Sequence, residues 1–208
     1  MMAKVKISGL ANYNDALDAT NLGADFLSFD FIKESTKKVS EKLFLNITSK
    51  LPSFVNCIAA LYNNEERDIL RAIKKCSIKN IQFNNDILPE LCKSIRETQN
   101  VKVFKYFKVN QESDIFKVVS YRDVVDYFIL NICDVNGQIR KSNYEIVLKI
   151  MDLKVPVFID IATQFEDIKE CIKNINPYGF DADSLIEKLA KRKDYNKMSA
   201  FIKASHGF

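Results

Sequence analysis

Histidine is nearly absent from this chain of 208 residues, and its scarcity excludes several kinds of active site. The only histidine, His206, lies close to the C-terminus. A Ser-His-Asp triad or a histidine-based metal site needs a histidine held rigidly in a pocket, and a chain terminus is a poor place for one. We therefore exclude serine hydrolases and metal hydrolases, and we expect no metal site.

Paired cysteines and long apolar runs are missing as well. No stretch is apolar for long enough to span a bilayer, and the first residues lack the apolar core of a signal peptide. We therefore expect a cytoplasmic protein with no membrane partner. The cysteines include no Cys-x-x-Cys pair, so we expect them to be reduced and mainly packed; they are Cys57, Cys76, Cys92, Cys133 and Cys171.

Charge of one sign does not accumulate along the chain. The 31 basic and 27 acidic residues are mixed and leave a formal charge of +4. This mixture is typical of a solvated surface, so no nucleic-acid partner is expected. We interpret the densest basic stretch, Lys188–Lys193, as an exposed loop before a helix, with an anion site as the alternative.

The sequence does contain a regular alternation of short apolar strands with amphipathic helices, which is typical of an α/β protein with a parallel sheet. The expected strands are Val5–Ser8, Phe26–Phe29, Val55–Leu61, Asn80–Phe83, Val101–Phe107, Tyr127–Asn131, Val155–Ile161 and Gly179–Ala182. The expected helices are Asn14–Leu22, Ser40–Leu51, Asn64–Cys76, Ile87–Thr98, Glu112–Ser120, Asn143–Leu153, Phe165–Ile175 and Asp194–Ala204.

This repetition predicts a single-domain (β/α)8 TIM barrel over residues 1–208. A doubly wound sheet is the competing architecture, but it usually carries a Gly-rich turn after its first strand, where only Gly9 is found. In the barrel, active sites lie at the C-terminal ends of the strands. The residues expected there are Ser8, Asp30, Asn84, Asn131, Asp160 and Asp181–Leu185.

Short motifs at these strand ends, taken in order, carry a resemblance to a known family. They include Lys6–Leu10, Leu22–Asp25, Ser35–Ser40, Gln82–Asp86 and Pro177–Asp181. Across essentially the whole chain they resemble phosphoribosylanthranilate isomerase, whose first motif reads Lys-Ile-Cys-Gly. The resemblance implies an Amadori rearrangement in tryptophan biosynthesis, in which a small phosphorylated sugar amine is isomerised without a cofactor. The resemblance does not identify a protein partner.

The resemblance places the two catalytic positions at Ser8 and Asn131. The family has its base, a cysteine, at Ser8; a serine hydroxyl forms no useful anion unless an adjacent base activates it. The family has its acid at Asn131, and a carboxamide exchanges no proton in the useful range. Asp134, shortly after, is the alternative acid. Each lost acid or base is expected to lower the rate by roughly 10²–10⁴-fold.

The two loops that hold the phosphate in the family are also changed. They read Asp160-Ile161-Ala162 where the family has Gly-Gly, and Asp183-Ser184-Leu185 where it has Ser-Ser-Gly. Glycine lets backbone amides approach an anion closely. Asp183 places a carboxylate at the expected phosphate position, and two unit charges about 4 Å apart repel by roughly 4 kcal/mol at an effective dielectric of about 20. We expect no phosphate to bind here.

The resemblance assigns substrate contacts to three further residues. Lys37 replaces an arginine, which keeps the charge but loses the planar fork of the guanidinium. Asn84 replaces a histidine. Asp181 matches the family's own residue, although a carboxylate at the end of a strand also has structural uses.

Three functions remain open from the sequence. The first is an active isomerase with unusual residues, which the retained Lys6, Gly9, Asp181 and Glu187 favour. The second is a catalytically inactive barrel with a divergent binding or regulatory role, which the joint change of base, acid and phosphate loops favours.

The third is a different activity on the same scaffold. Lys6 or Lys105 could form a Schiff base, and the alternative for each is a lysine paired with a carboxylate of the barrel. The carboxylates expected at the mouth could hold a cation or an amine, or could simply be solvated; they are Asp30, Asp160, Asp181 and Asp183.

Overall fold

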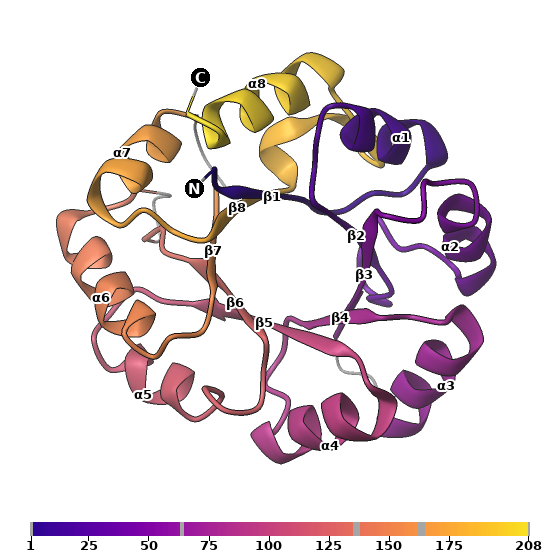
Figure 1. Ribbon diagram of the computed structural model, residues 1–208, viewed down its shortest axis with the longest axis horizontal. Coiled ribbons are helices and arrows are strands. Elements are labelled where there is room, and N and C mark those ends of the chain that lie inside the picture. The colour runs from indigo at the N-terminus through magenta and orange to yellow at the C-terminus, as the bar shows by residue number, and fades with distance from the viewer. Residues whose placement is uncertain (1, 63–64, 135–137, 162–164, 208) are drawn as a thin grey trace.

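The computed structural model describes the whole chain except residues 1, 63–64, 135–137, 162–164 and 208. Within that part, strands β1 to β8 are parallel and close into a barrel in sequence order. The helices form a ring around the barrel, and α8 lies beside α1 where the ring closes (Figure 1). The predicted (β/α)8 barrel is confirmed, and the doubly wound sheet is excluded.

The elements follow the predicted order closely. The strands are β1 (Lys4–Ile7), β2 (Phe26–Asp30), β3 (Asn56–Leu61), β4 (Asn80–Phe83), β5 (Lys102–Lys108), β6 (Tyr127–Asn131), β7 (Val157–Asp160) and β8 (Gly179–Ala182). The helices are α1 (Tyr13–Asn21), α2 (Glu41–Thr48), α3 (Glu66–Cys76), α4 (Pro89–Gln99), α5 (Asp114–Val119), α6 (Lys141–Met151), α7 (Glu166–Asn174) and α8 (Tyr195–Ser205).

One feature after β8 was not predicted. A short 3-10 helix, η1 (Ser184–Ile186), leads into an antiparallel hairpin of β9 (Glu187–Leu189) and β10 (Arg192–Lys193). The basic stretch that we interpreted as an exposed loop is therefore partly folded. Lys193, at its end, is only 6% exposed.

The strands are buried on both faces, as expected for a parallel sheet covered by helices. On the outer face, apolar side chains of the strands and helices form the large core. On the inner face, a separate aromatic cluster fills part of the barrel; its buried members are Phe26, Ile58, Phe104, Ile129 and Phe158. The barrel interior is therefore packed at this level rather than open.

The inner face becomes polar toward the C-terminal ends of the strands. Ser28 and Asp30 follow Phe26 at alternate positions of β2, so their side chains share its inward face. Asp160 follows Phe158 on β7 in the same way. The polar side chains thus gather at the end of the barrel where TIM-barrel active sites lie.

Two further observations concern the cysteines and the helices of the described residues. The five cysteines are free thiols, and all except Cys57 are buried. No helix in the described part is long and apolar enough to cross a membrane.

Candidate active site

Ser8, at the predicted base position, belongs to a buried group of three side chains. Lys6 and Asp181 are in register on the paired strands β1 and β8. Lys6 Nζ donates to Asp181 Oδ2 at 2.8 Å and also to Ser8 Oγ, which in turn donates to Asp181 Oδ1 at 2.7 Å. The Ser8 hydroxyl is thus engaged on both sides. The pairing of Lys6 with a barrel carboxylate is confirmed.

Asn131, at the predicted acid position, belongs to a second group of side chains. Its Nδ2 donates to Asp160 Oδ2 at 3.1 Å, and the Tyr106 hydroxyl donates to the same oxygen at 3.1 Å. Burial and the nearby charge of Asp181 raise the pKa of Asp160 to about 6. A carboxyl group therefore lies one hydrogen bond away from the position where the family has its acid.

The two groups meet at neighbouring strands, because Asp160 on β7 and Asp181 on β8 are in register. They differ in their electrostatics. Asp181 has an ammonium partner in Lys6, whereas the donors to Asp160 among the described side chains are the neutral Tyr106 and Asn131. Of the two carboxylates, Asp181 therefore has a counter-charge and Asp160 is held by neutral groups.

Asp183, directly after β8, forms a third group with two lysines. Its Oδ1 accepts from Lys37 Nζ and from Lys193 Nζ, each at 2.7 Å. Glu187 Oε1 lies 2.9 Å from Lys37 Nζ and 3.3 Å from Lys193 Nζ, so two carboxylates balance the two ammonium groups. Burial alone would raise the pKa of Asp183, but Lys193 and Lys37 outweigh it and lower the pKa. We call these four residues the Asp183 clamp.

The absence of a side chain at Gly9 leaves the space that the Asp183 carboxylate occupies. Its φ of +67° is a conformation that favours glycine, and a Cβ at this position would lie 2.3 Å from Asp183 Oδ1. The retained glycine of the first motif thus packs against this chain's own carboxylate.

Asp30 and Asn84 complete the rim formed by the predicted residues. Asp30 Oδ2 accepts from Ser35 Oγ at 2.6 Å, and burial raises the pKa of Asp30. Asn84 Oδ1 accepts from Gln82 Nε2 at 2.6 Å. Neither forms a hydrogen bond with Ser8 or Asn131 in the described structure.

The remaining phosphate-loop positions lie in different local structures. Ile161 is buried and its amide donates to Asp181 O at 2.8 Å, so that amide is engaged. Ser184 and Leu185 lie in η1. Ala162 lies outside the described residues.

Two alternatives from the sequence find other roles. Asp134 Oδ2 lies 2.7 Å from Arg140 Nη2, so this alternative acid is held by an arginine. Lys105 is buried, but it is not paired with a barrel carboxylate: its Nζ donates to Tyr106 O and lies 4.5 Å from the Phe107 ring centre. It faces the helix layer, because its neighbour Phe104 faces inward. A Schiff base of Lys105 at the mouth is therefore excluded.

Sequence reasoning missed two residues of the site. Lys193 belongs to a basic stretch in which no local pattern distinguishes it from the other basic residues. The β9–β10 hairpin places it beside Asp183. Tyr106 lies inside a strand that is rich in aromatic and basic residues, and its inward position could have been found by counting two residues on from Phe104.

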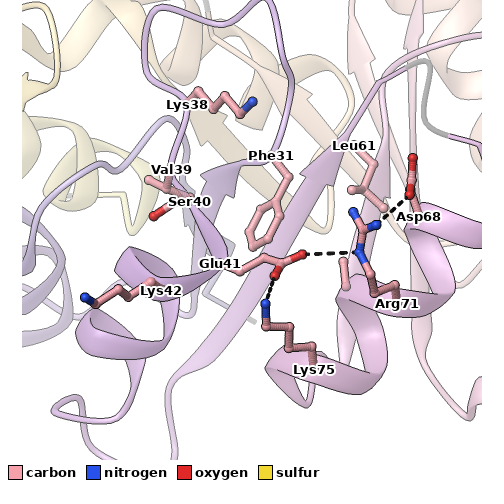
Figure 2. A pocket seen from close by; sticks show the side chains of 11 residues that line it. Phe31, Lys38, Val39, Ser40, Glu41, Lys42, Leu61, Asp68, Arg71 and Lys75 are labelled. Atoms are coloured by element: carbon pink, nitrogen blue, oxygen red, sulfur yellow. Dashed lines mark ion pairs between the residues drawn. The ribbon is translucent and has the colours of Figure 1, made fainter.

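A separate cavity of about 470 Å³ lies outside the barrel, between the loop that follows β2 and helix α3. Figure 2 shows Glu41 between Arg71 and Lys75. Glu41 Oε1 lies 3.8 Å from Arg71 Nε, and Glu41 Oε2 lies 2.7 Å from Lys75 Nζ. Arg71 also pairs with Asp68 at 3.0 Å. Most of the charged side chains that line the cavity are thus paired with one another. We assign the cavity no function.

No group of three or more His, Cys, Asp or Glu side chains suited to a metal ion occurs among the described residues.

Comparison with known proteins agrees with the fold and with the motifs. The family model of N-(5'-phosphoribosyl)anthranilate (PRA) isomerase matches residues 5–204. The chain is 29% identical to such an isomerase of Petrotoga mobilis, covering 93% of this chain and 92% of that protein. It is 27% identical to the isomerase of Trichlorobacter lovleyi, covering 97% of each.

Solved structures give the same result. The isomerase of Thermotoga maritima superposes with a TM-score of 0.89 at 26% identity, with both chains fully covered. A structure of the isomerase in complex with reduced 1-(o-carboxyphenylamino)-1-deoxyribulose 5-phosphate superposes with a TM-score of 0.88, also at 26% identity and full coverage. The chain belongs to the N-(5'-phosphoribosyl)anthranilate isomerase family.

Proposed function

We propose that this chain no longer isomerises phosphoribosylanthranilate, and that its barrel mouth instead binds a ligand without a phosphate group. The Asp183 clamp carries this proposal. Asp183 replaces the first serine of the family's Ser-Ser-Gly loop, and its carboxylate already accepts from Lys37 and Lys193. The positive charge that would attract a phosphate is thus neutralised from within the chain.

The electrostatic argument sets the size of the effect. A phosphate beside the ionised Asp183 would be repelled by roughly 4 kcal/mol for each unit of its charge at about 4 Å and an effective dielectric of about 20. To avoid this repulsion the ligand would have to separate Asp183 from its lysines. Because Lys193 is buried, separating this pair carries the large penalty of an uncompensated buried charge.

The catalytic positions support the same proposal. Ser8 accepts from the Lys6 ammonium, and a group that is already donating hydrogen bonds to Ser8 and Asp181 does not act as its base. Asn131 uses its amide to donate to Asp160. Neither residue replaces the proton transfer that the family's cysteine and acid perform.

Turnover of phosphoribosylanthranilate by the purified protein tests the proposal directly, with the Thermotoga maritima isomerase as the positive control. Since base and acid are both changed, we expect kcat/KM to be lower than that of the control by at least about 10⁴-fold. A value within tenfold of the control would overturn the proposal.

Stepwise reversion locates the defect. The double variant Ser8→Cys with Asn131→Asp restores the two catalytic groups but leaves the Asp183 clamp in place, so we expect it to stay inactive. Adding Asp183→Ser should produce measurable turnover. Activity in the double variant alone would show that the clamp does not exclude the substrate.

One observation favours a second candidate, a retained isomerase in which Asp160 replaces the family's acid. Asp160 lies 3.1 Å from Asn131 Nδ2, and its pKa of about 6 suits proton donation near neutrality. This candidate requires turnover of phosphoribosylanthranilate by the unmodified chain. It also requires that Asp160→Asn lowers kcat/KM by at least about 10²-fold. The assay described above therefore separates the two.

A further inference from the structure

Two carboxylates at the barrel mouth form no ion pair with any residue that the structure describes. Three lysines at the mouth are committed elsewhere: Lys6 pairs with Asp181, while Lys37 and Lys193 belong to the Asp183 clamp. Asp30 and Asp160 take part in no ion pair in the described structure. These two carboxylates are therefore the ones at the mouth that could form an ion pair with a bound cation.

Only uncharged side chains donate to these two carboxylates in the described structure. Tyr106 and Asn131 donate to the same oxygen of Asp160, which leaves Oδ1 with no hydrogen-bond donor among the described side chains. Ser35 likewise donates to Oδ2 of Asp30. Each carboxylate therefore offers a further acceptor oxygen.

The other charged groups of the region do not fill this gap. Lys108 ends β5 in register with Asn131, but its side chain is exposed and forms no ion pair with Asp160. The internal segments outside the described residues, 63–64, 135–137 and 162–164, contain no lysine, arginine or histidine in the sequence. They supply no cation either.

A second and independent observation comes from buried side chains below the mouth. Ser28 is 1% exposed and Gln82 is 4% exposed, yet Ser28 Oγ and Gln82 Oε1 have no hydrogen-bond partner within the described part of the chain. Both face inward: Ser28 is in register with Ile58, and Gln82 with Phe104, which are members of the inner cluster. Buried polar atoms in proteins are normally paired, so unpaired ones point to a missing partner.

The position of the Gln82 amide directs this partner toward the mouth. Its Nε2 donates to Asn84, which lies beyond the end of β4, so the amide is at the mouth side of the residue. The unpaired atom, Oε1, is an acceptor. Together with the free oxygens of Asp30 and Asp160 it calls for a ligand that is rich in hydrogen-bond donors.

We propose, on the basis of the function proposed above, that the mouth recognises a small unphosphorylated ligand through a primary ammonium group seated on Asp160. An ammonium group supplies three donors and the missing positive charge. The absence of three clustered metal-type ligands among the described residues favours an organic cation over a metal ion. Because an eight-stranded barrel encloses little space, the ligand is of sugar size or smaller.

The electrostatics of the site agree with this geometry. Burial raises the pKa of both Asp30 and Asp160, because it disfavours their charged forms more than the surrounding donors and lysines favour them. The groups facing Asp160 are Tyr106, Asn131 and Asp181, with Lys6 beyond Asp181. A bound ammonium group is expected to lower the pKa of Asp160 again.

The test uses three related sugars as probes of the unmodified protein at about pH 7, where most of the amine is protonated. D-Glucosamine and D-glucose differ in one group, an ammonium instead of a hydroxyl, and D-glucosamine 6-phosphate adds a phosphate. Isothermal calorimetry and the shift of the melting temperature report binding. We expect glucosamine to bind at least tenfold more tightly than glucose, and the phosphorylated sugar to bind at least tenfold more weakly than glucosamine.

Variants connect the binding to Asp160. Asp160→Asn keeps the size of the side chain and should weaken the binding of glucosamine at least tenfold. Asp123→Asn is the matched control, because the side chain of Asp123 is 92% exposed and remote from the mouth; it should bind as the unmodified protein does. The folded state of both variants is checked by circular dichroism before binding is measured.

The outcomes separate this inference from the proposed function. Failure of glucosamine to bind, equal binding of glucose, or unchanged binding in Asp160→Asn would each overturn the recognition of an amine. Binding of glucosamine 6-phosphate as tightly as glucosamine would instead overturn the exclusion of phosphate by the Asp183 clamp.

Discussion

Asp160 and Asp183 lie at the ends of neighbouring strands and have the same side chain, but the structure gives them opposite electrostatic surroundings. Two lysines hold Asp183, and its pKa is lowered. Only a tyrosine and an asparagine donate to Asp160, and its pKa is raised. The counter-ion, rather than the position at the barrel mouth, therefore decides whether a carboxylate there stabilises the fold.

The two regions also differ in how their partners arrive. Asn131 and Tyr106 belong to strands, and the barrel itself places them beside Asp160. Lys37 comes from the loop after β2 and Lys193 from the β9–β10 hairpin, so the Asp183 clamp depends on segments outside the barrel. The loops supply lysines to Asp183, whereas the strands supply only uncharged donors to Asp160 among the described residues.

The largest effect on stability is expected for Asp183→Asn. The substitution keeps the shape of the side chain but leaves Lys193, which is 6% exposed, without one of its two carboxylates. We expect the free energy of unfolding to fall by about 2–3 kcal/mol at pH 7, less than for a fully buried pair because the Asp183 side chain is partly exposed. Urea unfolding measures this change.

The pH dependence and a control make this prediction sharper. The folded-state pKa of Asp183 is lowered, so its contribution is present above the unfolded value near 4 and is lost as the pH falls through the folded value. The variant and the unmodified protein should therefore converge in acid. Glu187→Gln removes the other carboxylate, whose contact with Lys193 is longer, and an effect as large as that of Asp183→Asn would contradict the central role of Asp183.

An effect of opposite sign is expected for Asp160→Asn. The substitution removes a carboxylate that lacks a cation and keeps an acceptor for Tyr106. We expect the free energy of unfolding to rise by about 1–2 kcal/mol at pH 7. Because the pKa of Asp160 is raised to about 6, its unfavourable contribution grows as the pH rises from near 4 to above 6.

The gain in Asp160→Asn should therefore shrink as the pH is lowered toward 4, and thermal unfolding across this range measures it. A destabilised variant at pH 7 would show that the charge of Asp160 is compensated in the folded protein.

A smaller gain is expected for Lys105→Met, outside the barrel mouth. Lys105 is another buried charge without an ion pair in the described structure, and burial lowers its pKa to about 8. Replacing it removes that desolvation but also the contacts of Nζ with Tyr106 O and the Phe107 ring, so we expect a net stabilisation of about 1 kcal/mol at pH 7.

The sign of the pH effect distinguishes this prediction from the one for Asp160. With a folded pKa of about 8 below the unfolded value near 10.5, the unmodified protein gains stability as the pH rises between these values. The advantage of Lys105→Met should therefore disappear at high pH. An advantage that persists there would show that packing, rather than charge, is responsible.

The sequence by itself determined the barrel and the polar positions at its mouth. Short apolar runs alternating with amphipathic patterns fix eight strand–helix pairs, because a parallel strand buried on both faces and a helix buried on one leave distinct periodicities. Since each strand ends at the same side of the barrel, Ser8, Asn131, Asp160 and Asp181 could be brought together by counting along the strands.

Only the tertiary structure decided which of these groups are charged and which are neutralised. An ion pair such as Lys193 with Asp183 depends on the fold of a hairpin after the last barrel strand, and no local pattern in a basic stretch shows which lysine turns inward. Burial and counter-ions act through space, across residues that are far apart in the chain, whereas periodicity acts between neighbours. The fold could therefore be predicted from the sequence, and the electrostatics of the site could not.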